Sequence, residues 1–219
     1  MKRMIAVAAL VVATTTLPAL GDEGAEETGG IRTGFIAGVQ GGLTSTDVTL
    51  ILDGNGVGTV DFTGGEGGVF AGYRVKADRF VGTLEVEALL STGSEDVDSP
   101  IGLMQVESRA AAGISVTGGY VLAGHDPDDS TDGGEITAFA RVGYRALLAD
   151  VNAAGQGGTD VFHGLRYGGG LSYAITDAIE ARVEYSRTSY RDQNYGSGRN
   201  TLTVGPSGDL VSFGLVYRF

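Results

Sequence analysis

The chain has 219 residues and no cysteine, and 27 acidic against 15 basic residues give it a formal net charge of −12. The lack of cysteine excludes a disulfide framework, and the negative charge disfavours nonspecific binding to nucleic acid or to an anionic lipid surface. Glycine is abundant at 38 residues, whereas proline is scarce at 4. This composition suits tightly curved strands, in which a missing side chain lets neighbouring groups approach closely.

The N-terminal segment has the pattern of a secretory signal peptide. A basic start is followed by a largely apolar run over residues 4–20, and Gly21 ends a small-residue cleavage site before an acidic stretch. We therefore expect residues 1–21 to be a cleaved signal, residues 22–32 a short periplasmic segment, and residues 33–219 a single domain. After the signal, no stretch of the sequence approaches the ~18 continuous apolar residues of a membrane helix.

From residue 33 onward, eight segments alternate between apolar and polar residues with the period of two that is typical of strands. In chain order they cover residues 34–44, 65–76, 80–90, 105–122, 136–148, 161–173, 179–190 and 210–219. Each is at least about as long as the ~9–11 residues with which a tilted strand crosses a bilayer. An open sheet in lipid would leave unpaired edge N–H and C=O groups, so the sheet must close. The pattern predicts an all-β fold, an eight-stranded antiparallel up-and-down transmembrane β-barrel.

The connections between these segments alternate in character. The breaks after the first, third, fifth and seventh segments are long and polar, at roughly 45–63, 91–104, 149–160 and 191–209. Long outer loops and short periplasmic turns produce this alternation, with both termini on the periplasmic side. The break at about 123–135 is longer than a periplasmic turn should be. Two short strands could also be hidden in a loop, for example around Val48–Leu52, which would make ten strands.

Aromatic residues lie on the apolar faces at strand ends that this topology places on the periplasmic side. They are Phe35, Tyr73, Phe80, Tyr120, Tyr173, Tyr217 and Phe219. Such rings settle at the level of the lipid headgroups and form an aromatic girdle. The last segment, Leu210–Phe219, also places an aromatic residue at the very end of its apolar face.

The terminal strand resembles the C-terminal signature of bacterial outer-membrane β-barrels. The chain as a whole resembles small outer-membrane barrels of the OmpA/opacity "porin family" type, over residues 70–74, 82–87, 140–144, 167–173, 181–185 and the terminal strand. The resemblance implies an integral protein of the Gram-negative cell outer membrane, in contact with outer-membrane lipid and lipopolysaccharide. It also implies that Tyr217 and Phe219 are read by the assembly machinery. We expect a monomer with no nucleic-acid partner.

The faces opposite the apolar ones carry six acids and seven arginines. These residues are Glu66, Glu85, Glu87, Glu107, Glu180, Glu184, Arg74, Arg109, Arg141, Arg145, Arg166, Arg182 and Arg218. Buried charges must pair and form hydrogen bonds, and the planar fork of arginine bonds carboxylates bidentately. We interpret the set as an ion-pair network that fills a narrow lumen, since side chains just fill an eight-stranded barrel. The alternative is a gated pathway in which pairs exchange partners to admit water and small ions.

No catalytic, cofactor or metal site is predicted. Lipid A deacylases of this size use a His-x-Ser pair, whereas His163 is followed by Gly164 and Leu165 and the only other histidine is His125. We therefore expect no enzyme. The sequence favours a structural or surface-interaction role in the envelope, through loops 45–63 and 191–209. The alternative function is a small-solute porin or ion channel through a gated polar lumen.

Overall fold

The computed structural model describes residues 31–52, 55–92, 94–99, 102–124, 133–153, 156–197 and 200–219. The expected signal peptide with its cleavage site at Gly21, and the expected segment 22–32 except its last two residues, lie outside these ranges. The same holds for His125 and much of the break at 123–135. Over the ranges that are described, no helix is long and apolar enough to span a membrane.

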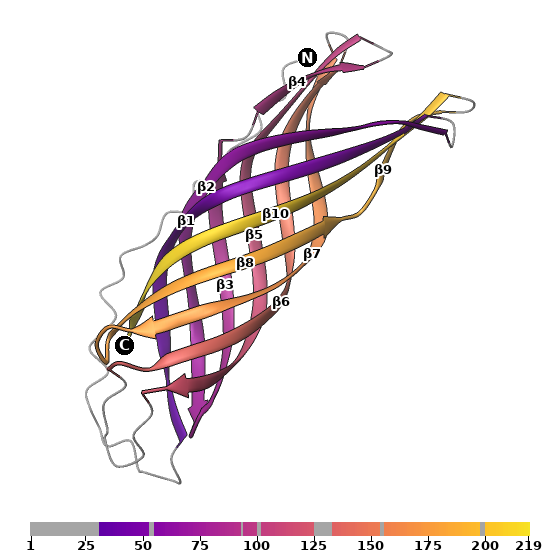
Figure 1. Ribbon diagram of the computed structural model, residues 1–219. Helices are drawn as coiled ribbons and strands as arrows, with labels where there is room; N and C mark the ends of the chain where they lie inside the picture. Colours follow the sequence, from indigo (N-terminus) through magenta and orange to yellow (C-terminus); the bar gives the residue numbers. More distant parts are fainter. Residues whose placement is uncertain are drawn as a thin grey trace.

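Ten strands make up the described chain. They are β1 (Ile31–Leu52), β2 (Asn55–Ala77), β3 (Phe80–Ser91), β4 (Ser94–Ser99), β5 (Gly102–Ala123), β6 (Ile136–Ala153), β7 (Gln156–Ala174), β8 (Ile179–Tyr190), β9 (Gln193–Ser197) and β10 (Asn200–Arg218). Eight of them form an antiparallel ring in the order β1-β2-β3-β5-β6-β7-β8-β10, which β1 closes by pairing with β10 (Figure 1). The prediction of a closed eight-stranded barrel is confirmed.

The two further strands lie outside the ring. Within the described ranges β4 pairs only with β5, and β9 only with β10. The alternative that placed an extra strand at Val48–Leu52 is wrong, because these residues continue β1 and pair with β2 and β10.

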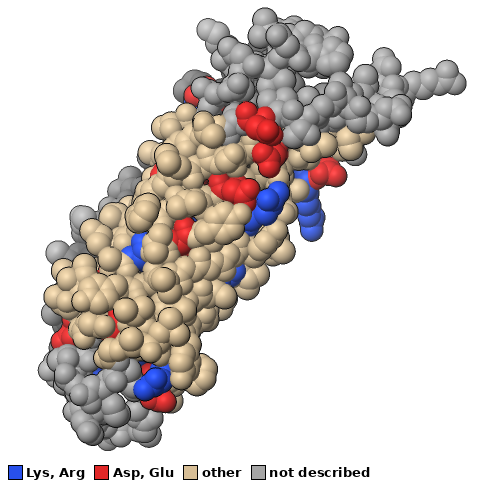
Figure 2. Space-filling view, viewed as in Figure 1, with Lys and Arg blue, Asp and Glu red and all other residues tan. Residues whose placement is uncertain are grey.

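The strands alternate between an outward apolar face and an inward face. On β3 the outward side chains of Leu84 and Val86 are exposed, whereas the alternating inward side chains of Glu85 and Glu87 are buried. The outward residues form an apolar belt around the barrel, and Figure 2 shows a largely uncharged surface along its middle. Edge-to-face aromatic pairs border this belt at one end, with ring centroids 5.2 Å apart for Phe35–Tyr73. The predicted aromatic girdle is therefore present.

One end of the barrel, which we call the turn end, carries short turns and the ends of the closing strands. Asp78 adopts a φ of 53° in the tight β2–β3 turn, and the β7–β8 turn is held by Thr176 Oγ1, which accepts a hydrogen bond from Ile179 N at 3.0 Å. The C-terminus lies here as well (Figure 1), where Phe219 N donates to Phe35 O at 3.0 Å.

The opposite end, which we call the extended end, differs from the prediction of long loops. The β1–β10 ladder continues to Leu52↔Leu202, but β2–β3 pairing stops at Glu66↔Ser91 and β7–β8 pairing stops at Gly164↔Tyr190. The ring therefore splits into two sheet extensions, β2-β1-β10-β9 and β4-β5-β6-β7, which form the two tips in Figure 1. The sequence no longer alternates between apolar and polar residues in these extensions, because the outer face of a strand beyond the apolar belt need not be apolar. For this reason the extensions were predicted as loops.

Candidate functional site

The interior of the barrel contains a continuous chain of paired charges that crosses between strands. Arg141 on β6 lies between two acids: its Nη2 is 2.6 Å from Glu85 Oε2 on β3, and its Nε is 2.9 Å from Glu184 Oε1 on β8. Arg166 on β7 extends the chain, with Nη2 3.0 Å from Glu184 Oε1 and Nη1 2.7 Å from Glu87 Oε2. The side chains of all five residues are almost fully buried.

Both ends of this chain are closed by further groups. Arg182 Nη1 lies 2.8 Å from Glu85 Oε1, and Gln40 Nε2 donates to Glu87 Oε2 at 3.0 Å. The arrangement therefore runs Arg182–Glu85–Arg141–Glu184–Arg166–Glu87–Gln40, which we call the central chain. It contains three arginines and three glutamates, so its formal charges cancel. This balance is what allows so many ionised groups to be buried.

The guanidinium groups of the central chain also contact serine hydroxyls and an aromatic ring. Arg166 Nε donates to Ser186 Oγ at 3.0 Å, and the Arg141 guanidinium also bonds Ser115. The Arg182 guanidinium lies 4.5 Å from the centroid of the Phe70 ring, a cation–π distance. The central chain is thus held in place by contacts beyond its own ion pairs.

Two further pairs, formed by residues of the predicted network, lie beside the central chain. Arg145 pairs with Glu66, and Arg74 binds Glu180 bidentately, at 2.7 and 3.0 Å. Arg182 also borders a cavity of about 20 Å³ with Thr83, Thr117, Thr137 and Ser172. This space can hold about one water molecule, far less than a continuous aqueous path requires.

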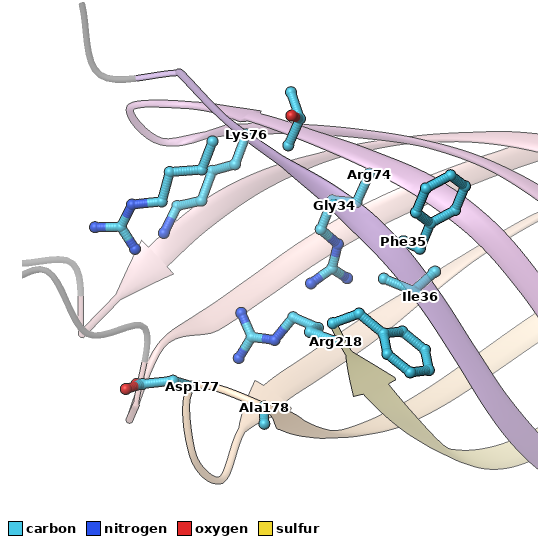
Figure 3. A pocket seen from close by; sticks show the side chains of 11 residues that line it. Gly34, Phe35, Ile36, Arg74, Lys76, Asp177, Ala178 and Arg218 are labelled. Atoms are coloured by element: carbon cyan, nitrogen blue, oxygen red, sulfur yellow. The ribbon is translucent and has the colours of Figure 1, made fainter. Parts of the chain in front are cut away.

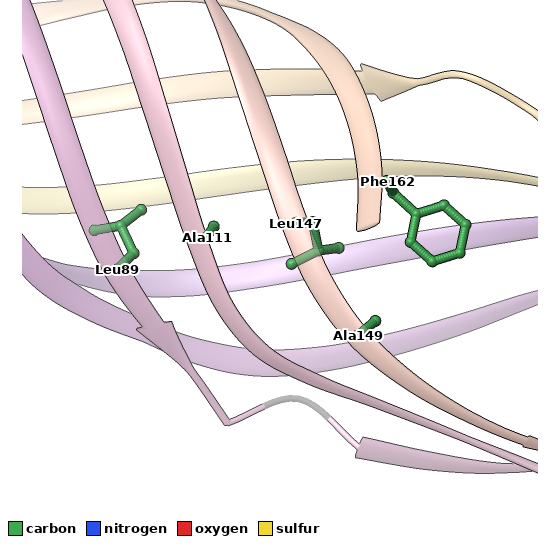
Figure 4. Packing of buried hydrophobic residues seen from close by; sticks show 5 residues of the cluster. All are labelled: Leu89, Ala111, Leu147, Ala149 and Phe162. Carbon is green, nitrogen blue, oxygen red and sulfur yellow. The ribbon is translucent and has the colours of Figure 1, made fainter. Parts of the chain in front are cut away.

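An apolar layer lies next to the central chain on the side of the extended end, where β3, β5, β6 and β7 contribute its side chains. It consists of the inward side chains of Leu89, Ala111, Leu147, Ala149 and Phe162 (Figure 4). Tyr190 packs against them. Leu89 follows Glu87 by two residues on β3, and Leu147 follows Arg145 by two on β6, so the layer lies directly beyond the charges. Apolar side chains lower the polarity around nearby ion pairs, which strengthens them.

The turn end contains an open pocket of about 340 Å³. Its lining comprises Arg32, Thr33, Gly34, Phe35, Ile36, Arg74, Lys76, Asp177, Ala178, Arg218 and Phe219. In Figure 3, the side chains of Arg74 and Arg218 border the pocket from different strands. Ile36 also packs with Phe70 and Val216 inside the barrel. We call this space the mouth pocket.

Two of the cationic side chains that line the mouth pocket bond residues that do not line it. Lys76 Nζ lies 2.7 Å from both carboxylate oxygens of Glu135, and Arg218 Nη2 donates to Thr176 O at 2.9 Å. Arg218 was predicted in the lumen network. The structure places it inward but at the mouth, near the Arg74–Glu180 pair and apart from the central chain.

Two predicted network residues do not face the lumen. The β5–β6 register shifts between Ser108 and Ala110, so Ser108 and Ala111 point inward while Glu107 and Arg109 lie on the outside. Their side chains are 49% and 55% exposed, and Arg109 Nε pairs with Asp150 Oδ2 at 2.6 Å. The prediction is wrong for Glu107 and Arg109 because a β-bulge reverses the inside–outside alternation.

Several residues of the site were missed from the sequence. Gln40 belongs to the central chain and Ser115 and Ser186 bond its arginines, but only charged side chains were expected in the network. Glu135 precedes the segment predicted to start at Ile136, so it was not expected to meet Lys76. The doublets Leu89-Leu90 and Leu147-Leu148 were the available signal for the apolar layer, because each places one apolar side chain inward.

His163 lies away from the lumen. Its ring stacks on Tyr144 with a centroid distance of 5.7 Å, and both side chains are on the outer face. Among the described residues, no three or more His, Cys, Asp or Glu side chains are grouped so that they could hold a metal ion.

The comparisons agree with this architecture. The sequence matches the family described as "Outer membrane protein beta-barrel domain" over residues 5–219, whereas no curated protein matches it. Outer membrane protein OprG of Pseudomonas aeruginosa is 16% identical, with a TM-score of 0.53, over 85% of this chain and 96% of that chain. This likeness shows the fold.

Two other solved structures are similar at lower scores. The Neisserial surface protein A, NspA, is 16% identical with a TM-score of 0.45, over 87% of this chain and 99% of that chain. The outer membrane protease OmpT of Escherichia coli is 10% identical with a TM-score of 0.40, over 85% of this chain and 97% of that chain.

Proposed function

The chain belongs to the outer-membrane protein β-barrel domain family, and from this premise we propose that it is a non-conducting barrel with a structural and surface-interaction role. Its place is the outer membrane of a Gram-negative bacterium, where the apolar belt contacts lipid and lipopolysaccharide and the protein acts as a monomer. The turn end faces the periplasm and the extended end faces the exterior, in keeping with short periplasmic turns and longer external segments.

The observation that carries this proposal is the set of buried ion pairs in the lumen. Along the barrel axis, the central chain fills the interior with paired side chains that are nearly inaccessible. The apolar layer lies beside it toward the extended end, on β3, β5, β6 and β7. An ion would have to break buried pairs to pass the central chain, which is costly. What remains accessible for function is the outer surface and the two sheet extensions.

The sheet extensions support a role at the cell surface. The β1–β2 hairpin and the β9–β10 hairpin continue beyond the apolar belt and pair with each other through β1 and β10. Such pairing presents the regions 45–63 and 191–209 on a hydrogen-bonded support rather than on isolated loops. We propose that these regions make the contacts of the protein with its surroundings.

No enzymatic role is proposed. Nucleophilic hydrolysis needs a base within hydrogen-bond reach of its nucleophile, and His163 faces outward, stacked on Tyr144. The carboxylates of the central chain are held by arginines, which keeps them from acting as general acids or bases.

Single-channel recording of refolded protein in planar bilayers tests the closed lumen. We expect no steady conductance for the unaltered protein. Steady steps whose size changes in Arg141→Gln would contradict the proposal and favour a small-solute pore with a gate at the central chain. Arg109→Gln is the matched control, because it removes the same charge from the outer face.

A shortened variant tests the surface role. Replacing residues 46–61 by a two-residue turn leaves the barrel part of the β1–β2 ladder intact, so we expect normal heat-modifiable gel mobility. If the barrel contributes to envelope integrity, this variant should restore detergent resistance to a strain that lacks the protein. It should not restore any adhesion of cells to polystyrene that the full-length protein confers. Equal adhesion with and without residues 46–61 would show that this hairpin does not make the surface contacts that we propose.

A further inference from the structure

The outer face of the barrel carries a groove near the turn end, with a volume of about 590 Å³. We call it the outer groove. Residues of β2, β3, β5 and β6 line it, and none of them is charged; they include Val75, Phe80, Gly82, Gly118, Tyr120 and Ala138. The volume lies within the ~300–1,000 Å³ that is usual for pockets that bind small molecules.

Two opposed glycines form the floor of the outer groove. Gly82 on β3 is paired with Gly118 on β5, and a Cβ at either position would meet nothing within 4 Å. Beside them, the exposed rings of Phe80 and Tyr120 pack edge to face with centroids 5.1 Å apart. Glycine inside a strand often marks a place where another molecule approaches the backbone closely. The groove therefore exposes bare backbone next to a pair of rings of the aromatic girdle.

Arg79 lies at the turn-end side of the outer groove. It directly precedes Phe80 in the β2–β3 turn, and its carbonyl oxygen accepts a hydrogen bond from Val121 N at 2.8 Å, one residue beyond Tyr120. Among the residues that the structure describes, none forms an ion pair or a hydrogen bond with the Arg79 guanidinium. The turn also contains Asp78, so what matters is the free N–H donors of one guanidinium and not a surplus of positive charge.

We propose that the outer groove and Arg79 together bind one phospholipid of the membrane leaflet at the turn end. An acyl chain lies in the groove and the phosphate group bonds the Arg79 guanidinium, because guanidinium N–H groups recognise phosphate oxygens through charge-assisted hydrogen bonds. The girdle marks the depth of the headgroups. Arg79 therefore lies on the headgroup side of Phe80, and Gly82 on the acyl-chain side, in the order in which a phospholipid presents these parts.

A lipid is the occupant that the surroundings favour, since the outer groove is continuous with the apolar belt. Inside a bilayer, apolar burial alone favours no particular partner, so close packing and polar contacts must supply the affinity. The groove supplies the first and Arg79 the second. The inference rests on the proposed position of the barrel in the membrane, but it does not depend on whether the lumen conducts, because the groove faces outward.

Native mass spectrometry of refolded protein, released from detergent micelles, tests the shape of the groove. The protein is titrated with phosphatidylglycerol, and separately with the diacylglycerol that has the same acyl chains and no phosphate. Gly82→Val/Gly118→Val fills the groove. The matched control is Gly41→Val/Gly67→Val, an opposed glycine pair on β1 and β2 where a Cβ would make only ordinary contacts, at 3.8 and 3.6 Å.

A second pair of variants tests the phosphate contact. Arg79→Gln removes the guanidinium at the groove. Its control, Arg191→Gln, removes an exposed guanidinium at the β8–β9 junction, which also has no ion-pair partner among the described residues. Heat-modifiable gel mobility verifies that every variant is folded.

We expect one phosphatidylglycerol per protein, bound about fivefold more weakly by Arg79→Gln, the factor that corresponds to ~1 kcal/mol for a basic residue at a lipid surface. With diacylglycerol, Arg79→Gln should bind like the unaltered protein. The variant Gly82→Val/Gly118→Val should lose affinity for both lipids, and both controls should keep it.

Unchanged lipid binding in Gly82→Val/Gly118→Val, or an equal loss in this variant and its control, would overturn the proposal. An equal loss in Arg79→Gln and Arg191→Gln would overturn the phosphate contact. Lipid-free dimers that Gly82→Val/Gly118→Val abolishes would assign the groove to a second copy of the chain and overturn the lipid assignment. None of these outcomes alters the result of single-channel recording, so this inference and the proposed function fail separately.

Discussion

Arg141 and Glu85 form an ion pair at 2.6 Å in which the arginine side chain is 0% and the glutamate side chain 3% exposed. The two residues are 56 positions apart in the chain and come from β6 and β3, which are separated in the ring by β5. Glu85 also binds Arg182, so one carboxylate holds two buried arginines. The stability of the lumen therefore depends on this carboxylate.

Replacing Glu85 by alanine should destabilise the barrel strongly, because Arg141 would lose one of its two carboxylates and Arg182 its partner in the central chain. Breaking one partner of a buried pair typically costs about 3–5 kcal/mol. Equilibrium unfolding by urea in lipid vesicles measures the change in the free energy of unfolding. Glu107→Ala is the matched control, since Glu107 is about half exposed on the outer face. Similar unfolding midpoints for the two variants would show that Glu85 is not in a packed network.

The apolar layer should respond to the size of the side chain at position 162. Phe162 is 4% exposed among Leu89, Leu147 and Ala149, so Phe162→Ala should cost about 3–5 kcal/mol through the cavity it leaves. Phe162→Leu leaves a smaller cavity and should cost less. Urea unfolding of both variants in detergent micelles provides the comparison, and equal, small effects would mean that the layer is loosely packed.

The inward glycines should differ from the outward ones in their tolerance of a methyl group. A Cβ at Gly170 would collide with the backbone of Val183 and Glu184 on β8, whereas a Cβ at Gly118 meets nothing within 4 Å. Gly170→Ala should therefore cost about 1–3 kcal/mol or more through overpacking, and Gly118→Ala should stay within about 0.5 kcal/mol. Thermal unfolding of the two purified variants checks this; a neutral Gly170→Ala would contradict the close approach of β7 and β8.

Deletion of Phe219 should impair assembly in cells more than it alters the finished barrel. The motivation is the terminal aromatic strand, which resembles the assembly signal of outer-membrane barrels. We expect a low folded yield in the membrane by heat-modifiable gel mobility, while refolding of the purified variant from urea remains efficient. Phe213→Ala, which alters an aromatic residue on the same face of β10, is the control. Normal folded yield in cells after deletion of Phe219 would rule out this role.

The pH dependence of stability should include a contribution from Asp47, which lies on β1 beyond the apolar belt. Partial desolvation, a hydrogen bond with Asp61 and repulsion from Asp61 raise the pKa of the Asp47 carboxyl above its ordinary value of 3.8. Because the folded state holds this proton more tightly, the contribution is fully present below pH 3.8 and is lost as pH rises through the folded-state value.

The variant Asp47→Asn should flatten this part of the pH profile. The expected difference in urea midpoint between the variant and the unaltered protein is small at low pH and grows toward neutral pH, where the variant is the more stable. High salt should reduce the difference, since the group is near the surface. A difference that is independent of pH would contradict the raised pKa of Asp47.

The sequence by itself determined the membrane-crossing part of this protein. Outward residues such as Val39, Val86 and Phe213 repeat every second position, because lipid on one side and a polar interior on the other impose two environments on each strand. The strand count, the antiparallel order, the girdle and the inward position of Arg141 and Glu184 all follow from that period. The same period placed Leu89 and Phe162 inward, although their packing into one layer was not foreseen.

Only the tertiary structure decided which inward charges meet and where the alternation is interrupted. Partners such as Arg182 and Glu85 are set by strand tilt and register around the ring, which a one-dimensional pattern does not contain. The bulge at Ser108–Ala110 is followed by Ala111 and Ala112, whose small apolar side chains fit either face, so the pattern gave no sign that Glu107 and Arg109 had moved outside. The sheet extensions escaped prediction for a related reason: beyond the lipid, the outer face of a strand can be polar, so no periodic apolar face marks the strand in the sequence.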